Sequence, residues 1–208
     1  SLIADLDPRA TSLEGYLFPE TYDVLDGMDE RELATEMVRA ARAALGDLGV
    51  GPEGREIAGV RLDLHDIVTL ASIVELETAA PSERPRIASV FLNRMKKGMR
   101  LQTDPTVIYA LKLAGRYDGN IRKADLQDAS PYNTYRYAGL PPGPIASAGR
   151  AAFEAVLHPE PTDALYFVSR NDGTHVFSAT LRDHERAVDE FQRRRARPQA
   201  QAPVRPAK

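Results

Sequence analysis

The sequence predicts an α+β fold in which helices dominate and one small antiparallel sheet is present. Apolar residues recur at helical spacing in several segments that begin with a capping residue and end near a glycine. One later segment instead places two β-prone runs around an Asp-Gly turn, which is typical of a hairpin. Helices and strands segregated along a chain in this way form α+β domains.

Six helices are predicted, and each begins at a side chain able to cap it. The expected capping residues, in chain order, are Asp29, Asp66, Ser82, Asp104, Ser147 and Thr180. The helices are expected to end near residues 46, 78, 98, 115, 157 and 195. Asp29 with Glu32 has the spacing of a capping box. Pro105 after Asp104 suits the first position of a helix.

The predicted hairpin joins "ALYFVS" (164–169) and "HVFSA" (175–179) through "RNDGT". An earlier aromatic stretch, "LEGYLFPETYDV" (13–24), is expected to be extended. Pro19 within it excludes a central strand, because proline cannot donate a ladder hydrogen bond.

Length and charge indicate one soluble body over residues 1–191 and a disordered basic tail, rich in Pro, Ala and Gln, over residues 192–208. The net charge of -3 gives no reason to expect nucleic acid as a partner. Absence of cysteine excludes disulfides and thiolate chemistry. No run approaches the ~20 apolar residues that span a bilayer, so we expect any membrane anchor to lie outside this chain.

Two carboxylates interrupt the apolar segment "LASIVELET" (70–78), at Glu75 and Glu77. If the helix runs over 67–78, Glu77 falls on its apolar side, and Glu75 points roughly 200° away from it. Side chains at i and i+2 do not face each other, so this helix alone does not make a paired-carboxylate site.

A carboxyl group held against apolar side chains keeps its proton more readily, as a general acid for a glycosidic oxygen must. Periodicity alone favours instead a structural role for Glu77, in an ion pair with Arg84 or Arg86. Glu75 has the same two interpretations, an ion pair or a hydrogen-bonding partner of the site.

Four longer stretches carry a family resemblance: "ASIVELET", "RPRIASVFLNRMKKGMRLQTDPTVIYAL", "SPYNTYRYAGLPPGPIAS" and "HPEPTDALYFVSRNDGTHVFSATLRDHERAV". Over about residues 13–188 they resemble the MltG (YceG-like) family of endolytic murein transglycosylases. The resemblance implies a YceG-like catalytic domain with a lysozyme-like cleft, and Glu77, directly before Thr78, as the catalytic residue. Many members carry lysine where this chain has Leu76.

The reaction implied by this resemblance is cleavage of the β-1,4 bond between N-acetylmuramic acid and N-acetylglucosamine in peptidoglycan. The C6 hydroxyl of the muramic acid replaces water, and a 1,6-anhydro end results. Because the nucleophile is tethered to the substrate, one acid/base suffices, unlike the two-carboxylate glycosidases. Glu77 is expected to protonate the leaving oxygen and then accept the hydroxyl proton.

Polar and aromatic loop residues are the candidates for substrate binding, because amides and hydroxyls suit sugar groups and tyrosine can stack on a sugar face. The candidates are Glu75, Gln102, Thr103, Asp104, Tyr132, Asn133, Thr134 and Tyr135. We expect them to share one site with Glu77, past the end of its helix. The four histidines show no metal-ligand spacing, so no metal and no cofactor are predicted.

Two alternative functions stay open. A lysozyme-like hydrolase would need a second carboxylate such as Glu75, Glu20 or Asp104. A non-catalytic glycan-binding module would leave Glu77 structural. The family resemblance also implies peptidoglycan strands and peptidoglycan synthases as partners. It further implies a place in the cell envelope, at the outer face of the plasma membrane, with an N-terminal anchoring helix that this chain does not contain.

Overall fold

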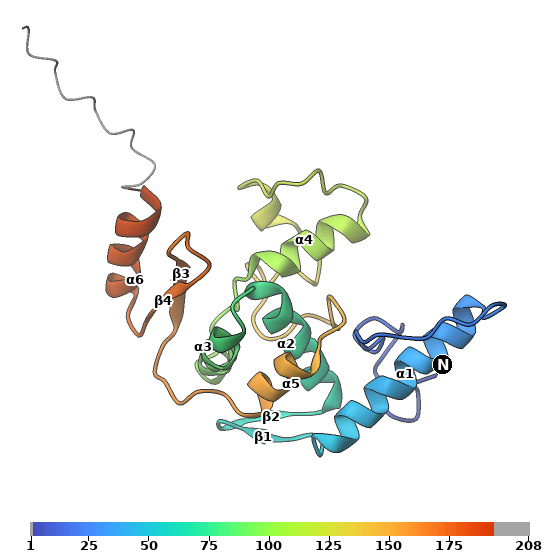
Figure 1. The fold of residues 1–208 in the computed structure, drawn as a ribbon. Coiled ribbons are helices and arrows are strands. Elements are labelled where there is room, and N and C mark those ends of the chain that lie inside the picture. The colour runs from blue at the N-terminus through green and yellow to red at the C-terminus, as the bar shows by residue number, and fades with distance from the viewer. Residues whose placement is uncertain (1, 194–208) are drawn as a thin grey trace, which may run out of the picture. The chain divides into compact units, whose positions relative to one another are not determined.

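The structure is a computed structural model that describes residues 2–193 (Figure 1). The chain divides into two compact units, one ending at Asp163 and one beginning at Ala164. This division falls inside the segment expected to form one body, and the domain boundary after residue 191 stays a prediction. The tail predicted over 192–208 lies outside the described residues from position 194 onward.

The α+β class is confirmed, with helices predominating, but the described residues contain two small sheets where one was expected. The first unit holds α1 (Glu30–Asp47), β1 (Arg55–Ile57), β2 (Val60–Leu62), α2 (Leu64–Glu77), α3 (Arg84–Lys96), α4 (Asp104–Leu113) and α5 (Arg150–Leu157). It also holds the 3₁₀ turns Pro81–Glu83 and Asp125–Gln127. The second unit holds β3 (Tyr166–Ser169), β4 (His175–Ser178), α6 (Leu181–Val188) and a π-helical turn, Asp189–Arg193.

Helix α2 is the centre of the first unit, and α3, α4 and α5 all pack on it (Figure 1). Every residue from Ile67 to Val74 is buried, so the helix has no solvent face over this stretch. A helix that is apolar on all sides is typical of a protein core. The prediction of a single apolar side for this helix was therefore wrong. After this stretch, charged residues return only in the last turn, which carries both glutamates.

Four predicted helix starts were wrong by one to three residues. Glu83, not Ser82, occupies the N-cap position of α3. Helix α2 begins at Leu64 because Asp63 is its N-cap, and Asp66 is the reciprocating third residue of a capping box. Thr103, not Asp104, occupies the N-cap position of α4. Gly149, not Ser147, precedes α5. The Asp29 capping box and the Thr180 cap are confirmed.

The β3–β4 hairpin is confirmed, with Phe167 paired to Phe177 in antiparallel register. The β1–β2 hairpin was missed, because its strands have only three residues each. Its turn residues, Ala58 and Gly59, both have positive φ, and alanine at such a position is not a recognisable turn signal. Residues 13–24, expected to be extended, contain turns and no strand.

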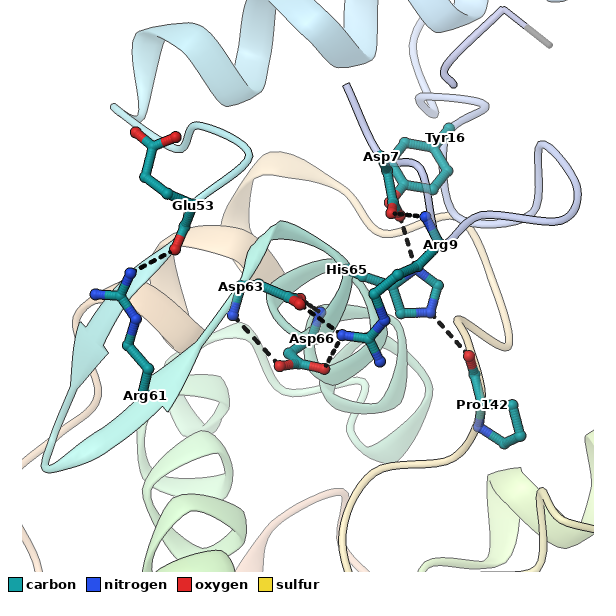
Figure 2. Close-up of polar contacts among 9 residues, drawn as sticks. All are labelled: Asp7, Arg9, Tyr16, Glu53, Arg61, Asp63, His65, Asp66 and Pro142. Atoms are coloured by element: carbon teal, nitrogen blue, oxygen red, sulfur yellow. Dashed lines mark hydrogen bonds and ion pairs between the residues drawn. The ribbon is translucent and has the colours of Figure 1, made fainter. Parts of the chain in front are cut away.

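A buried polar cluster fastens the N-terminal segment to the start of α2 (Figure 2). Asp7 Oδ2 accepts a hydrogen bond from the Tyr16 hydroxyl and lies 2.6 Å from His65 Nδ1. The other ring nitrogen of His65 lies 2.8 Å from the carbonyl oxygen of Pro142. All three of these side chains are at least 96% buried. The cluster therefore holds three segments together: the N-terminal segment, α2, and the loop containing Pro142.

The loop containing Pro142 continues along α2 towards its C-terminal end. Ile145 N donates to Ser72 Oγ at 3.0 Å, and Gly149 N donates to Glu75 Oε2 at 3.1 Å. With the His65 contact, three α2 side chains hold this segment at successive positions. The start of α5 is thereby fixed beside the last turn of α2.

Replacing Gly54 with alanine is expected to destabilise the protein by about 1–3 kcal/mol. Gly54 has φ +59°, and a Cβ there would lie 1.9 Å from the Leu62 carbonyl oxygen. Gly46→Ala is the matched control, because Gly46 lies in α1 with open space around it, and alanine favours helix. Urea unfolding should therefore show a lower midpoint only for Gly54→Ala. Equal midpoints would mean that this turn does not require glycine.

Candidate active site

Glu77 is the last residue of α2, and its side chain is half-buried. The apolar core of the helix ends one turn earlier, at Val74, so the carboxyl group stands at the border between the core and the surface. Thr103 Oγ1 donates a hydrogen bond to Glu77 Oε2 at 2.5 Å. This bond connects the end of α2 to the start of α4, two segments 26 residues apart in sequence.

Thr103 is held in place by a buried network of hydroxyl groups. Its backbone N–H donates to Thr134 Oγ1 at 3.1 Å, and its carbonyl accepts from Thr106 Oγ1 at 2.8 Å. The hydroxyls of Thr106 and Thr134 lie 2.8 Å apart. All three threonines are at least 98% buried. The hydroxyl that contacts Glu77 therefore has little freedom to move.

Gln102 sits between these groups and solvent. Its N–H donates to the Thr134 carbonyl at 3.1 Å, while its side chain is exposed. Its φ of +50° is unusual for a residue other than glycine. Such strain is kept where the surrounding structure fixes the backbone, and it is common at functional sites.

Asp104 and Tyr135 form a second contact beside Glu77. The Tyr135 hydroxyl donates to Asp104 Oδ1 at 2.6 Å. Burial, this hydrogen bond, and then the negative charges of Asp104 and Glu77 raise the pKa of Tyr135 well above its usual value. The phenol therefore stays protonated across the ordinary pH range. Both carboxylates are close enough to influence it.

Arg94 is a site-supporting residue that sequence reasoning did not single out. Its buried guanidinium donates to the Leu101 carbonyl at 2.7 Å and to the Arg100 carbonyl at 3.3 Å. It thereby fixes the segment just before Gln102. The available signal was an arginine among apolar positions of a predicted helix, because a buried charge must be paired or hydrogen-bonded.

Glu75 lies on the other side of the helix end and is engaged in structural contacts. Its Oε1 accepts from Arg84 at 2.9 Å, and its Oε2 accepts from Gly149 N at 3.1 Å. Glu75 thus connects α2 with the starts of α3 and α5. Arg84, considered above as a partner of Glu77, pairs with Glu75, and Arg86 pairs with Glu160.

Replacing Glu75 with glutamine is expected to lower activity less than tenfold. The amide loses the ion pair with Arg84 but can still accept from Gly149 N, so the helix end shifts little. Cleavage rates and urea unfolding of Glu75→Gln, Arg84→Gln and the double variant form a double-mutant cycle. Additive effects on stability would show that the two side chains do not interact.

The loop over 132–135 is divided between two environments. Asn133 is fully buried, and its amide donates to the carbonyls of Leu126 and Asp128 while its oxygen accepts from Tyr135 N. It therefore shapes the loop, and its role towards substrate stays a prediction. Thr134 belongs to the network beside Glu77.

Tyr132 instead packs against Tyr109 of α4 in a tilted arrangement, with ring centroids 4.8 Å apart. Both rings line a small polar cavity of about 110 Å³ together with Arg9 and Glu14. Burial and the Glu14 carboxylate raise the pKa of Tyr109 to about 12. The structure thus places Tyr132 with this cavity and not with the threonine network.

Within the part of the chain that the structure describes, no cluster of three or more His, Asp or Glu side chains is arranged to hold a metal ion. Over the same residues, no helix is both long enough and apolar enough to cross a membrane.

Comparison with known proteins assigns the chain to a family. The YceG-like family profile matches residues 3–190. The chain is 42% identical over 179 residues to an endolytic murein transglycosylase of Bacillus subtilis (strain 168), covering 86% of this chain and 48% of that protein. It is 35% identical over 184 residues to one of Streptococcus pneumoniae serotype 2 (strain D39), covering 86% of this chain and 32% of that protein. The chain thus spans less than half the length of these relatives.

A solved structure agrees with this assignment. The crystal structure of a YceG-like protein from Listeria monocytogenes superposes with a TM-score of 0.66 at 40% identity, covering 84% of this chain and 54% of that one. The profile match covers nearly all the described residues, and a likeness at this identity extends to sequence as well as fold. The chain belongs to the YceG-like family.

Proposed function

We propose that this chain is the catalytic part of an endolytic lytic transglycosylase that cleaves peptidoglycan strands between N-acetylmuramic acid and N-acetylglucosamine. The observation that carries the proposal is the half-buried Glu77 carboxyl at the end of an apolar helix, oriented by the buried hydroxyl of Thr103. The names of the relatives, endolytic murein transglycosylases, support the same reaction class.

In the proposed reaction, Glu77 in its protonated form donates to the glycosidic oxygen as the bond from that oxygen to C1 of the muramic acid breaks. The C6 hydroxyl oxygen of the same sugar then bonds to C1, and its proton passes to the Glu77 carboxylate. The products are a strand ending in 1,6-anhydromuramic acid and a strand starting with N-acetylglucosamine. Intramolecular attack supplies a large effective concentration of nucleophile.

The other residues of the site orient substrate in this proposal. Thr103 holds one oxygen of Glu77 and so fixes the orientation of the carboxyl group towards the bond in this proposal. Asp104, Tyr135 and the exposed amide of Gln102 supply hydrogen-bonding groups for sugar hydroxyl and N-acetyl groups. Peptidoglycan synthases as partners, and a position at the outer face of the plasma membrane, are part of the same proposal.

A lysozyme-like hydrolase is the second candidate, and the position of Asp104 favours it. Of the three carboxylates considered from the sequence, Glu75 is occupied by Arg84 and Gly149 N. Asp104, in contrast, shares the Tyr135 environment with Glu77. Two such groups could activate a water or form a glycosyl intermediate. Asp104→Asn separates the two mechanisms, because it should abolish hydrolysis and leave intramolecular attack largely active.

Turnover of purified peptidoglycan strands tests whether the chain is an enzyme. Long labelled strands should shorten to intermediate lengths early in the reaction, as expected for cuts within the strand. Strands that bind and keep their length would contradict the proposal and support a glycan-binding module. Shortening by single units from one end would contradict endolytic cleavage.

A further inference from the structure

A groove of about 230 Å³ opens beside the candidate site, in the first unit. Leu76 and Pro105 line one part of it, and these residues directly neighbour Glu77 and Asp104 in sequence. Ile108, Tyr109 and Lys112 of α4 continue the groove along the helix. The groove is therefore lined by the chain neighbours of the two carboxylate residues and continues along α4.

The lining of this groove is mainly apolar. Leu76 is 49% exposed, although the preceding residues of α2 are buried. Ile145, from the segment that runs along α2, also lines the groove. A sugar ring needs many hydrogen-bonding partners, and here only the hydroxyls of Tyr109 and Tyr117 and one ammonium group are polar. The surface suits a chain with small apolar side groups better than a sugar.

Lys112 gives the groove a single charge at its far part. No ion pair of Lys112 occurs within the described residues, and its ammonium lies 5.7 Å from the centre of the Tyr117 ring. No carboxylate lines the groove. A positive charge that has an aromatic ring but no carboxylate beside it in this groove is complementary to an acidic group on a ligand.

We infer that this groove binds the stem peptide carried by the muramic acid unit whose bond is cleaved. The inference rests on the proposed function, because only a peptidoglycan substrate brings a peptide to this position. Stem peptides combine alanine methyl groups with carboxylates, which match the apolar wall and Lys112. Eight residues of helix separate Asp104 from Lys112, about 12 Å along the axis. Three to four extended peptide residues span about the same length.

The groove thus makes the enzyme selective for strands that still carry peptides. Lys112→Glu is expected to lower kcat/KM on peptide-bearing strands about fivefold, because it replaces an attraction by a repulsion at a partly exposed site. Leu76→Gln should lower it about threefold through loss of apolar contact. On strands whose peptides have been removed with an amidase, both variants should match the wild-type chain. Lys123→Glu is the control, with the same charge change on an exposed lysine that does not line the groove.

Equal losses on both kinds of strand, or no loss on either, would overturn the inference and leave the proposed function intact. If the wild-type chain cleaves neither substrate, the proposed function fails. The assignment of the groove to a stem peptide is then tested by measuring ligand binding. N-acetylmuramoyl pentapeptide should then bind Lys112→Glu about fivefold more weakly than the wild-type chain. N-acetylmuramic acid alone should bind both equally. Unchanged affinity for the pentapeptide would overturn the assignment of the groove.

Discussion

Glu77→Gln is expected to reduce cleavage of peptidoglycan strands by at least ~100-fold, the lower range for loss of a positioned general acid. Glutamine keeps the size of the side chain and can still accept the hydrogen bond from Thr103. It has no proton to give to the leaving oxygen at neutral pH. The fold should be unaffected, because the side chain is only half-buried and its hydrogen bond with Thr103 is preserved. Initial rates on labelled strands, with urea unfolding in parallel, measure both effects.

Two variants serve as controls for this result. Glu36→Gln changes a glutamate of α1 whose side chain is 42% exposed, and it should leave activity unchanged. Glu75→Gln should lose less than a factor of ten, for the reasons given above. If Glu77→Gln kept near-wild-type activity and Glu75→Gln lost it, Glu75 would be the general acid and the assignment to Glu77 would be wrong. Full activity of both glutamine variants would contradict the single-acid mechanism.

Asp7→Ala is expected to destabilise the protein by about 3–5 kcal/mol, the range for removing one partner of a buried ion pair. The change leaves the Tyr16 hydroxyl and a ring nitrogen of His65 without their acceptor, in a region that water does not reach (Figure 2). The loss should appear as a lower urea midpoint with an unchanged slope.

Asp5→Ala is the matched control for Asp7→Ala. Asp5 is also an N-terminal aspartate with a charged partner, Arg42, but its side chain is 73% exposed. Exposed ion pairs contribute little to stability, so its unfolding midpoint should stay close to that of the wild-type chain. Equal midpoints for the two variants would mean that the buried cluster does not stabilise the fold.

The sequence predicted the long helices well because their signals are local. The Asp29 capping box and the Asp-Gly hairpin turn depend on residues within a few positions of one another. At the start of α2, two aspartates are possible N-caps, and the prediction of the second one was wrong. Asp63 and Asp66 both suit an N-cap, and the reciprocal hydrogen bond between them, visible only in the structure, decides that Asp63 is first.

Non-local features of the fold could not be read from the sequence. The β1–β2 strands are too short to show an alternation of apolar and polar residues. The His65–Asp7 contact joins residues 58 positions apart, and no spacing rule connects them. Burial of α2 on all sides follows from the helices that surround it, so the phase of a single helix could not reveal it.

The candidate site was partly accessible from the sequence. Reasoning on α2 alone separated Glu77 from Glu75, and the structure gives these side chains different neighbours. The search for polar loop residues suited to sugar groups selected Thr103 and Thr134, which the structure places in one network. The separation of Tyr132 from this network could not be foreseen, because it depends on how the loop turns around the buried Asn133. Roles towards substrate stay predictions for all these residues.

The mass of the cleavage products tests the central claim most directly. Fragments released from purified peptidoglycan in water labelled with heavy oxygen should end in 1,6-anhydromuramic acid, lighter than a hydrolysed end by one water and free of the label. This result requires that the C6 hydroxyl, not a water molecule, bonds to C1. Fragments with reducing muramic acid ends that carry the label would contradict the account and assign the reaction to hydrolysis.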